Sequence, residues 1–266
     1  RAHYSAAFRD AASGVTTTSR ENTWLYNESG AIRLAKGVEL FAGTQTGLED
    51  SGAAPENAAN RNEQLPTTRS TQYEGGIRLR FGKNRLVASL FQITRPYFSF
   101  DATNHFVELG TAHYRGAELS FTGHFDRLTT LAGAVFSKPE VTGPGRTAGL
   151  VGERPAGTPD VYARLDLQYR TDVFNGLTPT VTFTYTGKRA LGSAPVAALG
   201  GKQMMLGSLP SLDLGLRESF KVGSVPASFR ATLQNVLNHQ GWRMLASNTL
   251  QPDEHRRLMM TLAADF

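Results

Sequence analysis

The side chains that could support chemistry are scattered along the sequence. The six histidines, at positions 3, 105, 113, 124, 239 and 255, contain no His-Glu-x-x-His motif and no close pair, so their spacing predicts no metal site. The absence of cysteine excludes disulfides and thiolate ligands. Serine, histidine and asparagine all occur, but no segment shows the local sequence pattern of a hydrolase nucleophile. Two glycine-rich segments, GPGRTAG (143–149) and GIRLRFGK (76–83), have the wrong spacing for a dinucleotide fingerprint and for a phosphate-binding loop. We therefore expect no catalysis and no resident cofactor.

Length and composition favour one domain, residues 1–266. Forty per cent of the residues are hydrophobic, but their runs fall far short of the ~20 residues that a membrane-spanning helix needs. A helical membrane protein is excluded, whereas a membrane β-barrel is not, because its strands are individually much less apolar. The net charge is +5, from 28 basic and 23 acidic residues. No run of five Lys or Arg occurs, and we expect no nucleic-acid partner.

The strongest regularity is the alternation of apolar and polar residues with period two, which predicts half-buried β-strands. In TQYEGGIRLRF (71–81), for example, Ile77 and Leu79 lie on the face opposite Arg78 and Arg80. About twelve such segments are expected, near residues 3–11, 22–35, 38–49, 67–81, 85–98, 106–125, 127–140, 158–172, 177–190, 208–222, 226–238 and 256–266. The fold class is therefore all-β.

The connections between these strands alternate in length. Tight turns are expected at 36–37, 82–84, 126, 173–176 and 223–225, and long loops at 12–21, 50–66, 141–157, 191–207 and 239–255. The segment 99–105 is a shorter exception. Short turns at one end and long loops at the other are typical of a transmembrane antiparallel up-and-down barrel. Alternation alone does not decide which face points outward, and the loop asymmetry is what favours a membrane barrel over a soluble β-rich binding module.

Several segments in order resemble TonB-dependent outer-membrane receptors, in particular the C-terminal half of the barrel in the siderophore-receptor branch. These are RSTQYEGGIRLRFGKNRLVASLFQITRPY (69–97), YRGAELSFTGHF (114–125), SFRATLQNVLNHQGW (228–242) and the closing LMMTLAADF (258–266). The resemblance implies a bacterial outer-membrane barrel of about 22 strands around an N-terminal plug. About twelve strands are present and no plug is recognisable, so we expect a fragment whose plug and TonB box lie elsewhere.

The resemblance also implies a function and partners. The protein would import a ferric siderophore or a similar metal chelate with energy from the TonB complex, which acts through the plug. Its other partners would be outer-membrane lipid and the barrel-assembly machinery, for which Phe266 would be the signal; alternatively, Phe266 is an aromatic of the membrane interface. The alternative function is an autonomous twelve-stranded outer-membrane barrel that acts as a channel, a translocator or a hydrolase.

Ligand contacts are expected from the extracellular loops and the upper lumen. Arginine would attract an anionic ferric chelate, and aromatic rings would stack on its aryl groups. The candidates are Arg95, Tyr97, Phe98, Arg146, Arg154, Trp242 and Arg243. The three aromatic residues could instead belong to the membrane-interface girdle or pack within loops. The charges expected to face the lumen and plug are Arg78, Arg80, Arg164, Asp166, Arg170 and Arg217. Their alternative role is ion pairing between neighbouring strands.

Overall fold

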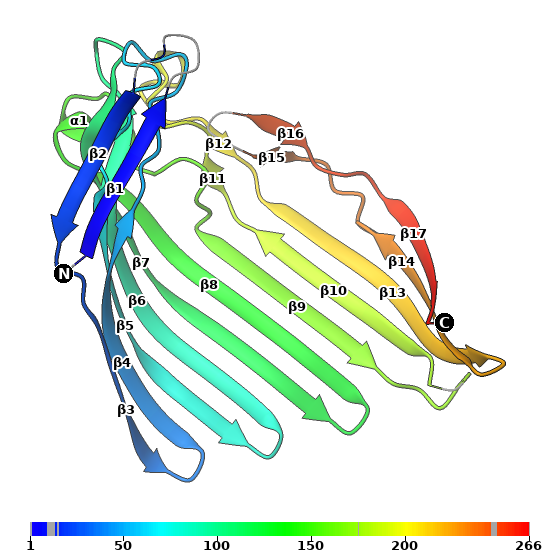
Figure 1. The fold of residues 1–266 in the computed structure, drawn as a ribbon. Coiled ribbons are helices and arrows are strands. Elements are labelled where there is room, and N and C mark those ends of the chain that lie inside the picture. Colours follow the sequence, from blue (N-terminus) through cyan, green and yellow to red (C-terminus); the bar gives the residue numbers. More distant parts are fainter. Residues whose placement is uncertain (1, 10–13, 15, 175, 246–248, 266) are drawn as a thin grey trace.

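A single antiparallel sheet of eleven strands forms most of the protein (Figure 1). The structure is a computed structural model that describes residues 2–9, 14, 16–174, 176–245 and 249–265. Each strand of this sheet pairs with the sheet's next strand along the chain, in an up-and-down order. The strands are β3 (Asn27–Ala35), β4 (Val38–Glu49), β5 (Thr68–Phe81), β6 (Asn84–Phe100), β7 (Phe106–Phe125), β8 (Leu128–Thr142), β9 (Val161–Tyr169), β10 (Thr178–Thr186), β13 (Leu209–Val222), β14 (Val225–Gln234) and β17 (Arg257–Ala264).

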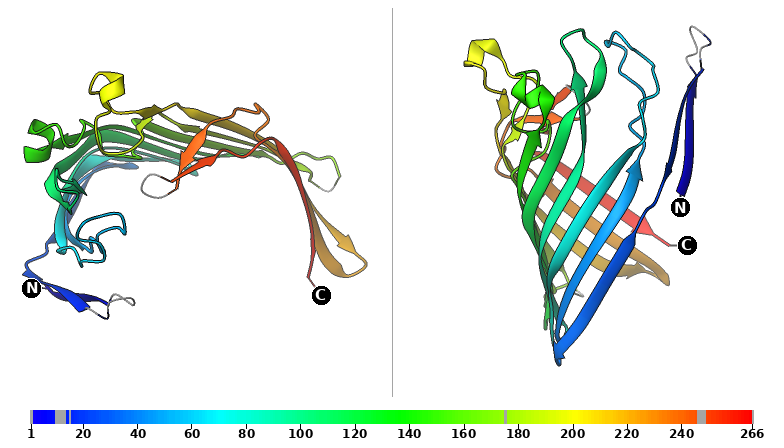
Figure 2. Two further views of the ribbon diagram at one scale, coloured as in Figure 1. Left: turned by 90° about the horizontal axis from the view of Figure 1, so that it is seen from above. Right: turned by 90° about the vertical axis from the view of Figure 1, so that its left-hand side faces the viewer.

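The sheet curves into an open arc, with β3 at one edge and β17 at the other (Figure 2). Seen along the barrel direction, the strands follow part of a cylinder wall and do not close on themselves. This arrangement confirms the predicted all-β barrel architecture.

The first predicted strand is wrong as a member of the barrel sheet. Residues expected at 3–11 form β1 (Ala2–Arg9), which pairs only with β2 (Thr16–Thr23) in a separate hairpin. The expected strand 22–35 is likewise divided between the end of β2 and β3. The reason lies in the segment TTTSRENT, whose threonines favour extended backbone and provide β1 with a local partner. The barrel sheet therefore contains eleven strands where about twelve were expected.

The predicted loop asymmetry is confirmed. The turns joining β3 to β4, β5 to β6, β7 to β8 and β13 to β14 each contain one residue with positive φ: Gly37, Gly82, Asp126 and Gly223. At Gly37 a Cβ atom would overlap the carbonyl oxygen of Arg80, so only glycine fits without a shift. The long connections lie together at the opposite end (Figure 1). They carry α1 (Pro144–Thr147), η1 (Ala197–Leu199), β11 (Arg189–Ala190), β12 (Met205–Leu206), β15 (Trp242–Met244) and β16 (Leu250–Pro252).

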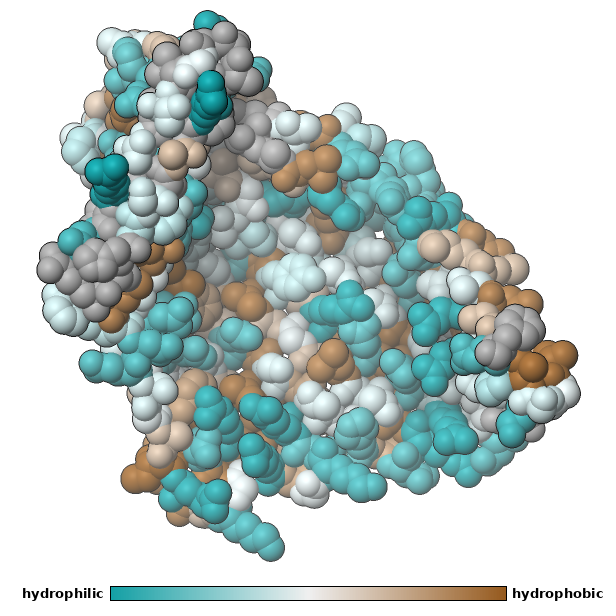
Figure 3. All heavy atoms as spheres, in the orientation of Figure 1, coloured by the Kyte–Doolittle hydropathy of each residue, from teal (hydrophilic) through white to brown (hydrophobic). Residues whose placement is uncertain are grey.

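The two faces of the sheet differ in polarity. The concave face presents mainly hydrophilic residues (Figure 3). By strand alternation, the apolar rows occupy the convex face, where Leu90, Phe136 and Leu262 are among the exposed large side chains. The C-terminal strand follows this rule, because Leu258, Met260 and Leu262 share one face and pair with β14 residues of that same face. Phe266 lies outside the described residues.

Among the described residues, a small hydrophobic cluster lies near the loops. Ala54, Ala58 and Leu65 form a buried group against which Phe98, Phe100 and Phe106 pack. This cluster anchors the 50–67 loop to the upper ends of β6 and β7. No helix within the described residues is long and apolar enough to cross a membrane.

Candidate functional site: the concave face and its loop end

The concave face carries ion pairs along the strands. The Arg78 Nη1 atom lies 2.7 Å from Oε1 of Glu39 on the neighbouring strand, and the guanidinium stands 4.0 Å from the centre of the Phe41 ring. Arg78 is thus paired within the sheet, which agrees with the alternative role of the lumen charges, ion pairing between neighbouring strands. Both members are about one-third exposed, which limits the contribution of this pair to stability.

A second polar group joins β9 and β10. Arg164 contacts Asp166 in a two-pronged arrangement, with Nε–Oδ2 at 2.7 Å and Nη2–Oδ1 at 2.8 Å. Thr182 on the adjacent strand donates its hydroxyl to Oδ1 of Asp166 at 2.7 Å. Because a residue and its second neighbour share a face of a strand, Arg164 and Asp166 pair within β9 itself. Sequence reasoning selected both residues but not Thr182, whose role depends on the register.

Other arginines of the concave face stand beside like charges. Arg80 pairs in register with Arg85, and Arg217 with Arg230. Among the described residues, none of these four forms an ion pair within 4.0 Å. Like charges directly opposite each other destabilise a strand pair, so both positions favour a nearby anion. Arg170 lies just past the end of β9, in the exposed turn before β10.

Nearer the loops, Arg95 helps to form a small recess on the concave side. Its Nη2 atom donates to the Tyr114 hydroxyl at 2.9 Å, and its Nη1 lies 3.8 Å from Oε2 of Glu49. Gln72 and Ile93 also line this recess of about 370 Å³. Glu49 and Tyr114 were missed by sequence reasoning, because only the successive pairing of β4 with β5, β5 with β6 and β6 with β7 brings them to Arg95. The recess offers one cation, one carboxylate and one phenol to a small polar ligand.

The loop arginines divide into paired and unpaired groups. Arg154 lies 3.8 Å from Asp160, and Arg243 lies 2.6 Å from Asp253. Arg146 in α1 is exposed and forms no ion pair with any described residue. Trp242 in β15 is 52% exposed. Arg146 and Trp242 are thus the predicted contacts that have the most freedom to engage a ligand.

Tyr97 and Phe98 occupy packed positions near the end of β6. Phe98 stacks on Phe106 with ring centroids 6.3 Å apart and packs against the buried cluster of the 50–67 loop. Tyr97 lies close to the backbone of Ala156 in a neighbouring loop. These contacts favour the alternative that both side chains pack within loops. A role of Tyr97 and Phe98 in ligand binding stays a prediction.

The long loops are joined to one another by polar side chains that sequence reasoning did not select. Gln203 donates from Nε2 to the Arg154 carbonyl at 2.7 Å and accepts at Oε1 from the Arg154 N–H at 2.8 Å. The hydroxyls of Ser99 and Ser193 lie 2.7 Å apart. These contacts hold the 143–160 loop and the end of β6 against the 187–208 loop.

Arg189 performs the same function between the last two loops. It is almost fully buried, and its Nη2 atom donates to the Trp242 carbonyl at 2.6 Å. Nη1 donates to the Gly187 and Gly207 carbonyls, each at 3.3 Å. Burial and the nearby Arg243 lower the pKa of this guanidinium, while Asp253 opposes the shift. Nothing in the local sequence distinguishes Arg189 from a solvated arginine.

Comparison with known proteins places this architecture in a family. The family model described as TonB dependent receptor-like, beta-barrel matches residues 1–238. The chain belongs to the TonB-dependent receptor β-barrel family. It is 26% identical over 201 residues to the ferrichrome receptor FcuA of Yersinia enterocolitica, an alignment that covers 74% of this chain and 26% of FcuA.

Solved structures of two ferric-chelate receptors share the fold. The ferric preacinetobactin receptor BauA of Acinetobacter baumannii superposes with a TM-score of 0.73 at 24% identity, covering 95% of this chain and 37% of BauA. The ferric yersiniabactin uptake receptor FyuA of Yersinia pestis gives a TM-score of 0.70 at 17% identity, covering 94% of this chain and 39% of FyuA. The chain therefore spans about a quarter of the curated relative and less than two-fifths of these receptors.

Proposed function

We propose that this chain forms part of the wall and the extracellular loops of an outer-membrane receptor that takes up a ferric siderophore or a similar metal chelate. Family membership supports the transport role, because the family consists of receptors and transporters. The observation that carries the proposal is the group of linked loops above a polar concave face, with unpaired arginines on both. We assign the chain no catalytic role.

The ligand would be an anionic chelate that carries aryl or other flat groups. Arg146 offers an unpaired guanidinium and Trp242 an exposed indole, and the Arg95 recess lies on the concave side. Arginine suits oxygen-rich anions because it can donate two parallel hydrogen bonds, and the indole suits stacking. The similar proteins, a ferrichrome receptor and receptors for ferric preacinetobactin and ferric yersiniabactin, support a ferric chelate as the class.

Energy would come from the TonB complex through a plug domain, with the arginines of the concave face as the plug's partners. Arg80 beside Arg85 and Arg217 beside Arg230 support this proposal, because each pair favours a facing anionic group. The apolar convex face would contact the lipid of the outer membrane, and the barrel-assembly machinery would insert the chain through its C-terminal strand and Phe266.

Binding of ferric chelates to the intact receptor in detergent tests the ligand class. Catecholate, hydroxamate and carboxylate chelates would be titrated while tryptophan fluorescence is followed. We expect one class to bind, Trp242→Phe to reduce the fluorescence change, and Arg146→Gln to weaken binding about tenfold, the loss of one hydrogen bond to a charged group. Lys36→Gln in a turn at the far end is the matched control. If no ferric chelate binds, or if both charge variants weaken binding equally, the proposal fails.

A further inference from the structure

A buried asparagine stands between β14 and the last long loop, residues 239–255. It is Asn235, the first residue of the segment NVLN (235–238), which directly follows β14. Asn235 is 5% exposed and has a positive φ of 47°. This left-handed backbone is unfavourable for most side chains, whereas glycine and asparagine adopt it readily. A buried polar side chain also needs hydrogen-bond partners. The position therefore imposes a requirement on the backbone and a second one on the side chain.

The Asn235 side chain bridges the two ends of the loop. Its Nδ2 atom donates to the His239 carbonyl at 3.0 Å, where the loop begins, and to the Glu254 carbonyl at 2.8 Å, where the loop returns to the sheet. Its Oδ1 atom accepts from the His239 N–H at 3.1 Å. The amide thus uses both of its donor hydrogens and its oxygen at this place. Because His239 and Glu254 are distant in sequence, one side chain holds the base of the loop closed.

The backbone of Asn235 fixes this base to the barrel wall. Its N–H donates to Oδ1 of Asp213 on β13 at 2.8 Å. A second link between the ends of the loop comes from Arg256, whose N–H donates to Oδ1 of Asn238 at 3.2 Å and whose Nη2 atom donates to the Val236 carbonyl at 2.6 Å. The base of the loop is therefore one hydrogen-bonded unit with the upper ends of β13 and β14.

Asparagine meets both requirements at position 235, and its nearest substitutes each meet one. Glycine tolerates the positive φ but has no side chain to bridge the loop. Aspartate keeps an acceptor for the His239 N–H, but it would place a carboxylate oxygen instead of a donor against the two carbonyl oxygens. The bridging hydrogen bonds and the backbone conformation can therefore be tested separately.

We propose that Asn235 is a positioning residue for ligand binding, because it holds the last long loop in one arrangement on the barrel wall. The loop carries the β15–β16 hairpin with Trp242 and Arg243, two of the predicted ligand contacts. Affinity falls by the fraction of molecules in which such contacts are out of place. Asn235 itself does not touch the ligand and acts through the position of the hairpin. This inference rests on the proposed function, which supplies the ligand.

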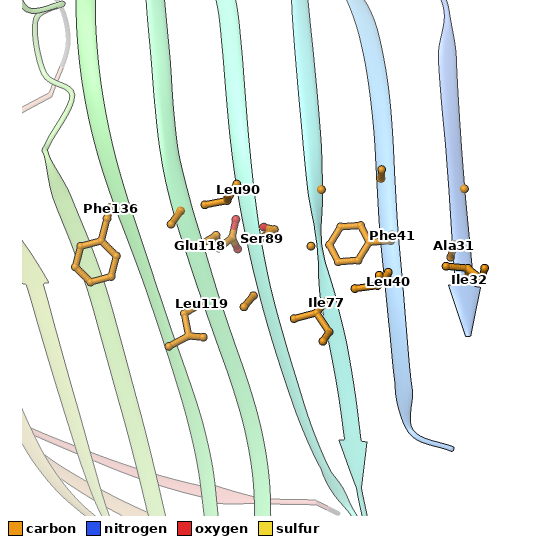
Figure 4. Close-up of a pocket in the computed structure, with 16 residues that line it drawn as sticks. Ala31, Ile32, Leu40, Phe41, Ile77, Ser89, Leu90, Glu118, Leu119 and Phe136 are labelled. Carbon is orange, nitrogen blue, oxygen red and sulfur yellow. The ribbon is translucent and has the colours of Figure 1, made fainter. Parts of the chain in front are cut away.

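The position of the loop can be measured without any chelate. Spin labels would be attached to an intact receptor free of other cysteines, at the exposed positions Gln251→Cys on β16 and Glu108→Cys on β7. Pulsed electron paramagnetic resonance then gives the distances between the labels. The reference is β7 because it pairs with both β6 and β8; Figure 4 shows this part of the wall, with Leu90 on β6 and Phe136 on β8. We expect a narrow distance distribution in the wild type and a broader one in Asn235→Gly.

Chelate affinity is measured on the same variants with ferric catecholate, hydroxamate and carboxylate chelates. Asn235→Gly keeps the left-handed backbone and the N–H bond to Asp213, but it loses the three side-chain hydrogen bonds. We expect roughly tenfold weaker binding and an unchanged melting temperature of the barrel. Asn235→Asp, which keeps the shape of the side chain, should weaken binding at least as much at neutral pH. Asn104→Gly is the matched control, because Asn104 also has a positive φ, 63°, and donates to the Asn57 carbonyl in a different loop.

The outcomes separate this inference from the proposed function. A broader distance distribution together with weaker chelate binding in both Asn235 variants supports the positioning role. The proposal is overturned if Asn235→Gly has the distance distribution or the chelate affinity of the wild type, or if Asn104→Gly changes either of them as much. If the wild type binds no chelate, the proposed function fails, whereas the distance distributions still decide whether Asn235 holds the loop.

Discussion

Replacing Arg189 by methionine should separate the last two long loops without unfolding the barrel wall. Arg189 donates to the carbonyl of Trp242 at 2.6 Å and to those of Gly187 and Gly207 at 3.3 Å. A hydrogen bond from a charged group contributes about 1.5–3 kcal/mol, and the two longer bonds contribute less. Methionine keeps much of the volume but leaves these carbonyls without the donor. We expect the local free energy of opening of β15 and β16 to fall by about 2–3 kcal/mol.

Hydrogen–deuterium exchange of the intact receptor measures this change directly. A loss of 2–3 kcal/mol corresponds to amide protection that is about 30- to 150-fold lower in β15 and β16, at 1.36 kcal/mol per tenfold. Protection in β5 to β8 should not change, because the hydrogen bonds of Arg189 go to the carbonyls of Gly187, Gly207 and Trp242, outside those strands. Arg243→Met is the control, since Arg243 is 61% exposed and its pair with Asp253 contributes no more than about 1 kcal/mol. Unchanged protection in the Arg189 variant, or an equal loss in both variants, would refute the role of Arg189.

Three further predictions concern the turns and the concave face. Hydrogen bonds from the His105 backbone and from the hydroxyl and backbone of Thr103 lower the pKa of Asp101. The ionised carboxylate therefore stabilises this turn fully at pH values above the ordinary Asp pKa, and that stability is lost as the pH falls through the lower pKa of the folded state. Asp101→Asn should remove the acid-dependent step in the protection of the His105 amide, and a persisting step would contradict this. Gly37→Ala should lower the free energy of unfolding more than Gly223→Ala does, by about 1 kcal/mol or more, because only the former creates an overlap with a backbone oxygen; the Gly37 variant should therefore have the lower urea midpoint, and equal midpoints would disprove it. A double-mutant cycle of Arg78→Met and Glu39→Gln should give a coupling of about 0.5–1 kcal/mol, as expected for a partly exposed pair, and a value near zero would show that the pair contributes nothing.

Much of the fold could be predicted from the sequence because period-two alternation and turn residues are local signals. Ile77 and Arg78 already indicate two faces, and Gly37 and Asp126 indicate tight turns. The first strand could not be placed, because pairing of β1 with β2 depends on competition between a local partner and a distant one. The segment 3–11 alternates whichever partner it takes.

The candidate site was less predictable, because its contacts depend on register. Arg164 and Asp166 could be selected as lumen charges, but their bond to Thr182 requires the alignment of β9 with β10. Arg189 and Gln203 act through backbone carbonyls of distant loops, and no local pattern marks such residues.

Uptake of radioactive iron by cells tests whether the receptor imports a ferric chelate with energy from the TonB complex. Iron-starved cells that carry the intact receptor would be given the ferric chelate that binds the purified protein, labelled with iron-55, before and after collapse of the proton-motive force. We expect surface binding in both conditions, accumulation only in energised cells, and a loss of accumulation in cells without the receptor. Accumulation that persists without the receptor or without the proton-motive force would contradict a role in TonB-driven uptake of a ferric chelate.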